Sequence, residues 1–288
     1  MNVQNCMPKV LYFLYVILLG CGGEWTNEPV GRTSCAFQDW MPSSHRPLKI
    51  TMGNNGNVLY VLDNSSNVHY YKRDNIYDCA FYFEDYYSFS GFPNDVFFAG
   101  NTFYVQDRAQ LKYKDGKEAC YAKDGFFAVR GQELAVGSTA GIEIWEIKSN
   151  CVKKENISLQ SVLALAAFNG EYYAAEANGF ASEPLNLAFY KNGVLLRKEP
   201  LSVTKGNEKN FCSADRIAAN NNGIFLFDKT CRKIGVFDNQ AYWKKTISLD
   251  SLGIRNPLDI AAGEHSYIFI LHQSGVEKIN AAQSLAAF

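Results

Sequence analysis

The chain has 288 residues, of which 47% are hydrophobic and 20% are charged, a composition typical of a globular protein. Its 28 basic and 29 acidic residues give a formal net charge of −1 with histidine neutral. This balance provides no basic surface for a nucleic acid and therefore excludes a polyanion as the expected partner. The length suits two ordinary domains or one large all-β unit such as a barrel or propeller.

The first twenty residues have the pattern of a secretory signal peptide. A polar start that contains Lys9 precedes an uninterrupted apolar run at residues 10–19, and the small residue Gly20 follows. This run is too short to cross a bilayer as a helix, which takes about 20 residues. We therefore expect residues 1–20 to direct export and then to be removed, and we expect no membrane-spanning segment in the rest of the chain.

Residues 18–21, Leu-Leu-Gly-Cys, resemble the lipobox of bacterial lipoproteins. The resemblance implies that Cys21 receives a diacylglyceryl thioether, becomes the new N-terminus and is then N-acylated, for example with palmitate. Two or more acyl chains are what stable membrane anchoring requires. Gly22, in place of an aspartate, favours the outer membrane over the inner one if the source is Gram-negative. The alternative is an ordinary signal peptide with a cysteine nearby by chance.

After a tether at residues 21–32, the folded part is expected at residues 33–288. Short apolar runs there alternate with turns rich in Gly, Asn, Asp and Ser, which predicts consecutive antiparallel strands. Six first-strand positions can be matched: Ile50, Val96, Ala128, Leu165, Ile217 and Ile260. The five steps between them cover 210 residues, a mean of 42, which suits four-stranded blades. Five or seven copies would require residues 33–42 or the fourth repeat to be counted differently.

The clearest repeat covers residues 213–281. Residues 215–238 contain Asp-Arg-Ile-Ala-Ala, Gly-Ile-Phe-Leu-Phe-Asp and Arg-Lys-Ile-Gly-Val-Phe-Asp, and residues 258–279 return to the same pattern. The first copy resembles an NHL repeat, the blade of many six-bladed propellers, closely in this blade and more loosely elsewhere. The sequence therefore predicts an all-β fold, a six-bladed β-propeller of four-stranded antiparallel blades.

The last repeat ends one strand short of the usual four. An apolar stretch at Ser34–Trp40 lies before Pro42, separate from the first repeat. We therefore expect Ser34–Trp40 to supply the outer strand of the last blade and to close the ring. Such closure removes sheet edges that would otherwise pair with other chains.

Six cysteines remain beyond the leader and Cys21: Cys35, Cys79, Cys120, Cys151, Cys212 and Cys231. An even number in an exported chain favours disulfides, although six cysteines allow fifteen pairings. In a propeller, the connection into a first strand and the turn between the second and third strands lie on the same face. Cys212 and Cys231 occupy these two places in the fifth blade, so we expect a disulfide between them. The other four cannot be paired from the sequence.

Three aspartates recur after the second strand of a blade: Asp63, Asp107 and Asp228. Each is expected to cap the following turn by accepting hydrogen bonds from backbone N–H groups. The alternative is a ring of carboxylates that binds a metal at the central channel. Capping is favoured because the third and sixth blades have Ser138 and His272 at this place, and because the spacing does not direct the side chains inward.

The sequence contains four histidines and no His-x-His, His-Glu-x-x-His or Gly-x-Ser-x-Gly motif. We expect His69, in a strand, and His265, in a turn, to have packing or surface roles. His272, at the end of an inner strand, would be the first histidine to mutate if an activity were found. The sequence therefore predicts no catalytic residue, no metal ligand and no cofactor.

Aromatic residues gather on the same loop face as Cys212 and Cys231. The candidates for ligand contact are Tyr86, Tyr87, Phe89, Phe92 and Phe180, and polar stretches at residues 178–184 and 204–210 share this face. Aromatic side chains on loops can form contact surfaces for sugars or proteins. The alternative is that they cover the ends of the blades.

Together these patterns predict a monomeric, lipid-anchored β-propeller outside the cytoplasm, which binds or scaffolds a protein or glycan at the cell envelope. The alternative is a propeller enzyme of the lyase or lactonase type that acts on an extracytoplasmic substrate. Fold alone does not decide between the two, because propellers host both. Clustered His, Asp or Glu at the channel mouth, with bound calcium or zinc, would favour the enzyme. The sequence does not identify the ligand.

Overall fold

A computed structural model of the chain describes residues 31–53, 56–148, 151–177, 184–201 and 209–282. The leader, Cys21, Gly22 and almost all of the tether lie outside these residues, as does Phe180. Within the described ranges, no helix has the length and apolar character needed to cross a membrane.

The first three blades follow one another along the chain. Blade one consists of β3 (Pro47–Gly53), β4 (Val58–Asp63), β5 (Asn67–Lys72) and β6 (Ala80–Ser88). Blade two consists of β7 (Asp95–Ala99), β8 (Thr102–Asp107), β9 (Gln110–Tyr113) and β10 (Glu118–Tyr121). Blade three consists of β11 (Phe126–Arg130), β12 (Glu133–Ser138), β13 (Gly141–Glu146) and β14 (Val152–Ile157).

The last three blades complete the ring. Blade four consists of β15 (Ser161–Phe168), β16 (Glu171–Ala177), β17 (Pro184–Lys191) and β18 (Val194–Pro200). Blade five consists of β19 (Arg216–Asn220), β20 (Gly223–Asp228), β21 (Lys233–Phe237) and β22 (Trp243–Ser248). Blade six consists of β23 (Asp259–Ala262), β24 (Tyr267–His272), β25 (Gly275–Asn280) and, from the front of the chain, β1 (Arg32–Ser34).

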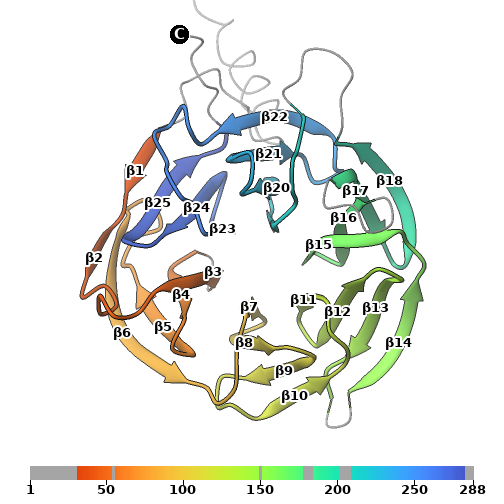
Figure 1. The fold of residues 1–288 in the computed structure, drawn as a ribbon, viewed down its shortest axis with the longest axis horizontal. Coiled ribbons are helices and arrows are strands. Elements are labelled where there is room, and N and C mark those ends of the chain that lie inside the picture. Colours follow the sequence, from red (N-terminus) through yellow and green to blue (C-terminus); the bar gives the residue numbers. More distant parts are fainter. Residues whose placement is uncertain (1–30, 54–55, 149–150, 178–183, 202–208, 283–288) are drawn as a thin grey trace, which may run out of the picture.

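The six sheets stand radially around one axis, and the first strand of each repeat lies nearest the centre (Figure 1). Each repeat is an antiparallel meander, and its innermost strand contacts the innermost strands of the two neighbouring blades. This arrangement confirms the predicted six-bladed propeller of four-stranded antiparallel blades, with a fifth strand added to the rim of blade one. The order follows from the sequence because each short turn places the next strand beside the previous one.

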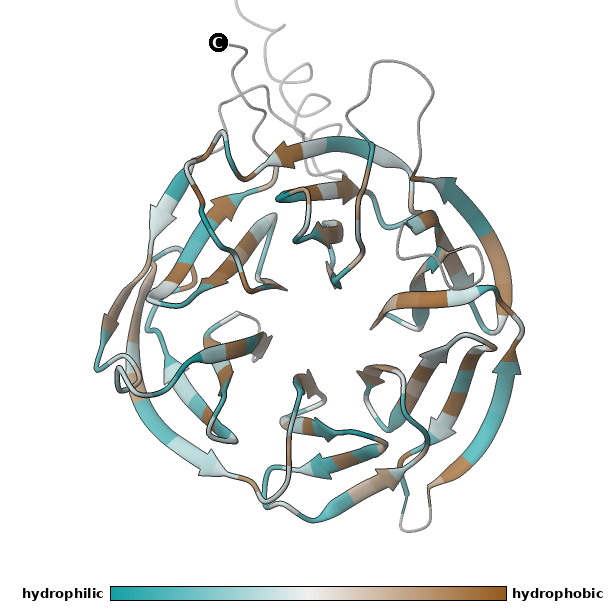
Figure 2. Cartoon of the chain, viewed as in Figure 1, coloured by the Kyte–Doolittle hydropathy of each residue, from teal (hydrophilic) through white to brown (hydrophobic). Residues whose placement is uncertain are grey.

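The hydrophobic core lies between the blades. The second strands are buried on both faces, so β4 and β20 are buried at every position and are nearly continuous apolar runs. Each core cluster joins two neighbouring blades; Phe225 and Phe227 of blade five, for example, share one with Ile268 and Ile270 of blade six. The rim strands are more hydrophilic (Figure 2), and five of the six residues of β14 are exposed.

The ring is closed by an N-terminal strand, as predicted, but the predicted bounds of that strand are wrong. The closing strand is β1, which pairs antiparallel with β25 and so completes blade six. The chain then crosses to blade one, where β2 (Ala36–Gln38) pairs in parallel with the rim strand β6. The backbone N–H of Cys35 still donates to the carbonyl of Val276, at 2.9 Å, whereas that of Ala36 donates to Cys79, at 2.7 Å.

Aromatic packing explains why most of the Ser34–Trp40 stretch lies on blade one. The Phe37 ring stacks on Phe81, with 5.3 Å between ring centroids, and contacts Tyr71 edge to face at 5.2 Å. The Trp40 ring stacks on Tyr71 at 5.5 Å. Tyr71 and Phe81 belong to blade one and are buried. The apolar residues therefore bury their surface on this blade, and the polar residues before them provide the backbone pairing for blade six.

Three disulfides are present among the described cysteines. Cys35–Cys79 joins the N-terminal segment to blade one. Cys120–Cys151 joins the rim strand of blade two to the start of the rim strand of blade three. Cys212–Cys231 lies within blade five, between the connection into β19 and the turn after β20. Each disulfide therefore restrains a connection or a rim strand, away from the inner strands.

Candidate functional site

Asp63 ends β4 and organises the turn that leads into β5. One of its carboxylate oxygens, Oδ1, accepts hydrogen bonds from the backbone N–H groups of Ser65 and Asn67, both at 2.8 Å. The side chain of Asp63 is fully buried. The predicted capping role of Asp63 is therefore confirmed, and it fixes the orientation of the second carboxylate oxygen.

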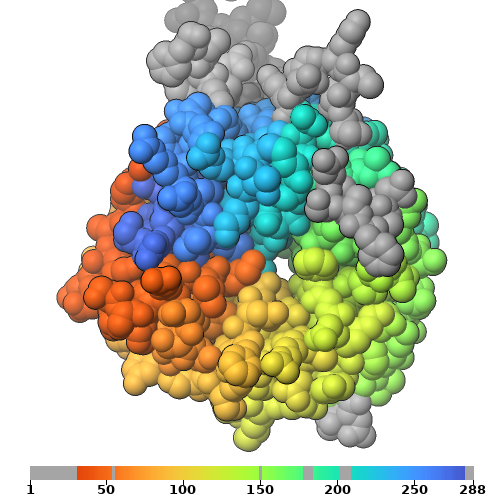
Figure 3. All heavy atoms as spheres, in the orientation of Figure 1, coloured from red at the N-terminus to blue at the C-terminus, as the bar shows by residue number. Residues whose placement is uncertain are grey.

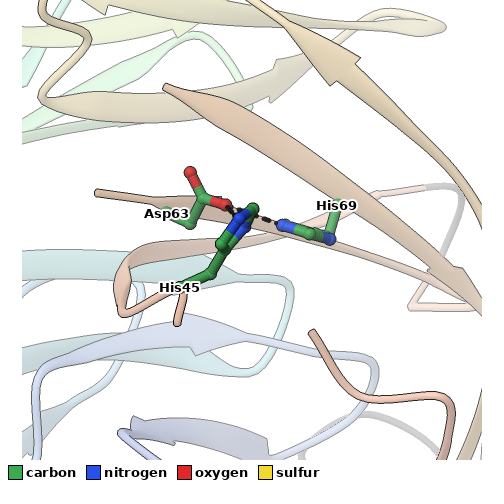
Figure 4. Close-up of side chains that lie close together, drawn as sticks. All are labelled: His45, Asp63 and His69. Carbon is green, nitrogen blue, oxygen red and sulfur yellow. Dashed lines mark hydrogen bonds and ion pairs between the residues drawn. The ribbon is translucent and has the colours of Figure 1, made fainter. Parts of the chain in front are cut away.

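That second oxygen of Asp63, Oδ2, contacts two imidazoles (Figure 4). It lies 2.6 Å from Nδ1 of His45, which precedes β3, and 2.8 Å from Nε2 of His69 on β5. The side-chain amide of Asn67 donates to the same oxygen at 3.2 Å. Because a carboxylate only accepts hydrogen bonds, both ring nitrogens carry protons, which neutral imidazole tautomers can supply. The three side chains form what we call the His–Asp–His triad.

The triad is charged at neutral pH through its carboxylate. Burial raises the pKa of Asp63, but the hydrogen bonds from His69, from Asn67 and from the backbone N–H of Ser65 outweigh it and hold the pKa at about 2. His69 is buried, and 27% of the His45 side chain is exposed. The anion is therefore fixed inside the protein, and His45 connects it to the surface.

A cavity of about 580 Å³ opens beside the triad, and His45 and His69 form part of its wall. Its wall also contains aromatic and polar side chains, among them Trp40, Phe83, Tyr86, Asp39, Asn67 and Ser88. The rings of Phe83 and Tyr86 each lie 6.4 Å from the His69 ring, centroid to centroid. This volume falls within the range of ligand pockets, about 300–1,000 Å³. We call it the blade-one cavity.

The aromatic residues expected on this loop face have different environments. Tyr86 lines the blade-one cavity and is 56% exposed, and Phe92 is 73% exposed outside it. Tyr87 is half-buried and packs edge to face on Phe103, at 5.1 Å between centroids. Phe89 is buried in the same cluster, between blades one and two, so a ligand on the surface cannot reach it. Phe180 lies outside the described residues.

The other two aspartates have different partners from Asp63, and of them only Asp228 caps the turn that follows its strand. Asp107 accepts from Phe92 and Lys112 instead, so its predicted capping role is wrong. Oδ2 of Asp107 accepts from the ammonium of Lys112 at 2.6 Å, and its Oδ1 accepts from the backbone N–H of Phe92 at 3.2 Å. Asp228 accepts from the backbone N–H groups of Cys212 and Cys231, at 2.7 and 2.8 Å. Of these three aspartates, Asp63 alone meets imidazoles.

A charged cluster spans the central channel near the starts of the inner strands. Arg216 of blade five forms an ion pair with Asp95 of blade two, on the opposite side of the ring, and its Nε lies 3.9 Å from Asp259 of blade six. Nζ of Lys49 approaches the same Asp259 oxygen, at 3.8 Å. Burial lowers the pKa of Arg216, but the negative charges of Asp95 and Asp259 have a larger, opposite effect. The pKa of Arg216 is therefore raised overall, and the guanidinium stays protonated. These side chains help to fill the centre, where a small opening remains (Figure 3).

His265 and His272 lie apart from the triad. His265 is exposed in the turn before β24 and stacks on Tyr77, with 5.8 Å between ring centroids. Nδ1 of His272 lies 3.2 Å from the carbonyl of Arg255, and burial lowers the pKa of this imidazole. Sequence reasoning missed the link between His45, Asp63 and His69. The positions of His45 before the first strand and of Asp63 at the end of the second strand of one blade are the signal that could have found the contact between these two residues.

Comparison with family models finds no match, and comparison with curated proteins finds none either. Among solved structures, the chain is similar to the WD40 β-propeller domain of Doa1, with a TM-score of 0.56 at 12% identity over 85% of this chain and 80% of that one. It also aligns with the computationally designed Ika8 protein, with a TM-score of 0.49 at 9% identity over 86% of this chain and 99% of that one. At this level of identity, the similarity to the Doa1 domain shows the β-propeller fold and nothing further.

Proposed function

We propose that this protein is a lipid-anchored, extracytoplasmic β-propeller of NHL-like type that binds an envelope glycan in the blade-one cavity. Export is supported by the leader-like residues 1–20 and by three disulfides, which persist in oxidising compartments. Anchoring is supported by the lipobox-like sequence that ends at Cys21, with Gly22 favouring the outer membrane. The protein acts as a monomer in this proposal.

The blade-one cavity is the observation that carries the binding function. Trp40, Phe83 and Tyr86 provide flat apolar surfaces, and Asp39, Asn67 and Ser88 provide hydrogen-bonding groups beside them. A sugar ring has the matching chemistry, with C–H groups on its faces and hydroxyl groups around its edge. Pockets that combine apolar walls with a few polar groups are typical of specific small-ligand sites.

We expect Tyr86→Ala to weaken glycan binding about tenfold, which corresponds to about 1.4 kcal/mol. The substitution removes one wall of the cavity from a side chain that is 56% exposed, so the fold should be retained. Glycan arrays of envelope oligosaccharides would identify a ligand, and calorimetry would compare the two proteins. Phe92→Ala is the matched control, because Phe92 is an exposed aromatic residue outside the cavity. Equal losses in both variants, or binding only to an envelope protein, would contradict the glycan proposal.

We expect Cys21→Ser to move the protein from the membrane fraction to the soluble extracytoplasmic fraction. Without the cysteine sulfur there is no thioether, and the remaining tether has no acyl chain to insert. Fractionation of cells with and without detergent would show the change, and Cys6→Ser within the leader is the control. Retention of the Cys21→Ser protein in the membrane would refute the lipid anchor.

The alternative function is a propeller enzyme of the lyase or lactonase type, and the His–Asp–His triad favours it. His45 lies at the cavity wall and is partly exposed, and its Nδ1 is held in place by Asp63. An imidazole oriented in this way can accept a proton from a bound substrate. Incubation with the glycan found on the array, followed by mass spectrometry of the products, would separate turnover from simple binding.

A further inference from the structure

The geometry of the His–Asp–His triad points to a metal site. His45, Asp63 and His69 each place one ligand atom within 4.8 Å of the ligand atoms of the other two. Two imidazoles and one carboxylate are the ligand types that zinc and related divalent ions bind in proteins. We propose that these three residues bind one divalent transition-metal ion of the zinc class. This proposal does not depend on the glycan function, because the ion is bound by the protein alone.

The carboxylate ligand is already oriented. Backbone N–H groups of Ser65 and Asn67 hold Oδ1 of Asp63, which leaves Oδ2 directed at both imidazoles. Hydrogen bonds of this kind to the non-ligating atoms position metal ligands and tune their affinity. His69 is restrained as well, because it is buried and its ring contacts Tyr71 and Phe83. Two of the three ligands therefore need little movement to bind an ion. The protons on Nδ1 of His45 and Nε2 of His69 must pass to the other nitrogen of each ring, a change of tautomer that leaves these two atoms free to bind the ion.

His45 supplies the movement that ion binding requires. The imidazole nitrogens lie 2.6 and 2.8 Å from Oδ2 of Asp63, which are hydrogen-bond separations. Metal–ligand bonds of about 2.0–2.2 Å in tetrahedral geometry place neighbouring ligand atoms about 3.3 Å apart. Each imidazole nitrogen must therefore move roughly half an ångström away from Oδ2 of Asp63 when an ion binds. His45 lies in the segment before β3 and borders the cavity, so its side chain can shift without displacing a strand.

The cavity leaves room for the remaining coordination positions. Three protein ligands and an open fourth position are the arrangement of catalytic zinc sites, in which water or a ligand oxygen completes the set. His45 and His69 both line the blade-one cavity, so an ion between them faces that space. A glycan hydroxyl or carboxylate could then bind the ion directly.

The equivalent positions in two other blades lack this chemistry. Lys112 supplies the positive charge beside Asp107, where an ion would otherwise bind. Asp228 lies near Cys212 and Cys231, but these sulfurs form a disulfide and provide no thiolate ligand. Among these three blades, the imidazole pair is specific to blade one.

Zinc titration of the full-length protein tests the proposal. The protein is purified in mild detergent without reductant, treated with EDTA, and titrated with zinc chloride by calorimetry in the absence of glycan. We expect one ion per chain, and we expect His45→Ala to weaken its binding on the order of 100-fold, since loss of even a supporting partner costs a metal site 10–100-fold. Zinc should also raise the Tm of the protein without substitutions and leave the Tm of the His45→Ala variant nearly unchanged.

His265→Ala is the matched control, because it removes one exposed histidine from outside the triad. His69→Gln is the second ligand variant, and Co²⁺ absorption in the visible range reports tetrahedral coordination directly. Absence of zinc binding to the unmodified protein would overturn the proposal. So would equal binding by the unmodified protein and His45→Ala, or loss of binding in His265→Ala alone. Because no glycan is present, a failed glycan array leaves this result unaffected.

Discussion

Replacing Arg216 with methionine is expected to lower the free energy of unfolding by about 3–5 kcal/mol, the cost of leaving a buried ion pair without one partner. Methionine keeps most of the side-chain volume but removes the charge that faces Asp95 and Asp259 across the channel. The two carboxylates would then have Lys49, 3.8 Å from Asp259, as their nearest remaining cation. Urea denaturation would measure the loss as a lower midpoint.

Arg232→Met is the control for this prediction. Arg232 forms an ion pair with Asp250 at 3.0 Å, but both side chains are about half exposed, so its loss should cost at most about 1 kcal/mol. Adding Asp95→Asn to Arg216→Met removes one of the unpaired charges and should restore part of the stability. If Arg216→Met cost no more than Arg232→Met, the channel carboxylates would have to be solvated by water, and the cluster would have no structural role.

Replacing both Cys35 and Cys79 with serine is expected to lower the free energy of unfolding by about 4 kcal/mol. The disulfide spans 44 residues, and the chain-entropy model gives about this value for a loop of that length. The bond also holds the chain at the point where it crosses from β1 to β2, between blades six and one. Without the bond, the pairing of β1 with β25 should therefore open at a lower free-energy cost than the strands inside the other blades.

Hydrogen exchange would separate this local effect from general destabilisation. Amides of β25 that pair with β1 should exchange faster in the double serine variant, relative to amides of β20 and β21. The matched control is the Cys212→Ser, Cys231→Ser variant, which opens a loop of 19 residues inside one blade and is expected to cost about 3 kcal/mol. If the amides of all strands exchanged faster by the same factor in both variants, the Cys35–Cys79 bond would have no special role in ring closure.

The blades could be predicted from the sequence because each repeat contains its own strands and turns. The bounds of the closing strand could not, because Arg32–Ser34 is three polar, exposed residues with no apolar pattern. Its pairing depends on Glu277, which accepts from Ser34 at 3.0 Å and from Arg32 at 2.7 Å. The apolar Phe37 and Trp40 favoured the wrong bounds, because their hydrophobicity predicts that they pack against a blade but does not show which blade; both are partly buried against blade one.

The contact between His45 and Asp63 could have been predicted with the same reasoning that placed Cys212 beside Cys231. In both cases, one residue lies in the connection into a first strand and its partner lies at or after the end of the second. His69 was beyond this rule, because its contact depends on which face of β5 it occupies, and this strand has buried residues on both faces. The cavity was also out of reach, since it requires Trp40 to lie beside blade one rather than blade six.

The pairing of β1 with β25 has a consequence for how the ring forms. These strands join residues up to 247 positions apart, Arg32 with Ile279. During synthesis, five blades can stack in order as they emerge, but the sixth lacks its rim strand until the first and last parts of the folded chain meet. Such a long-range contact forms late and slowly. Until then the outer edge of β25 has no partner strand, and a chaperone could bind there or neighbouring copies could aggregate there.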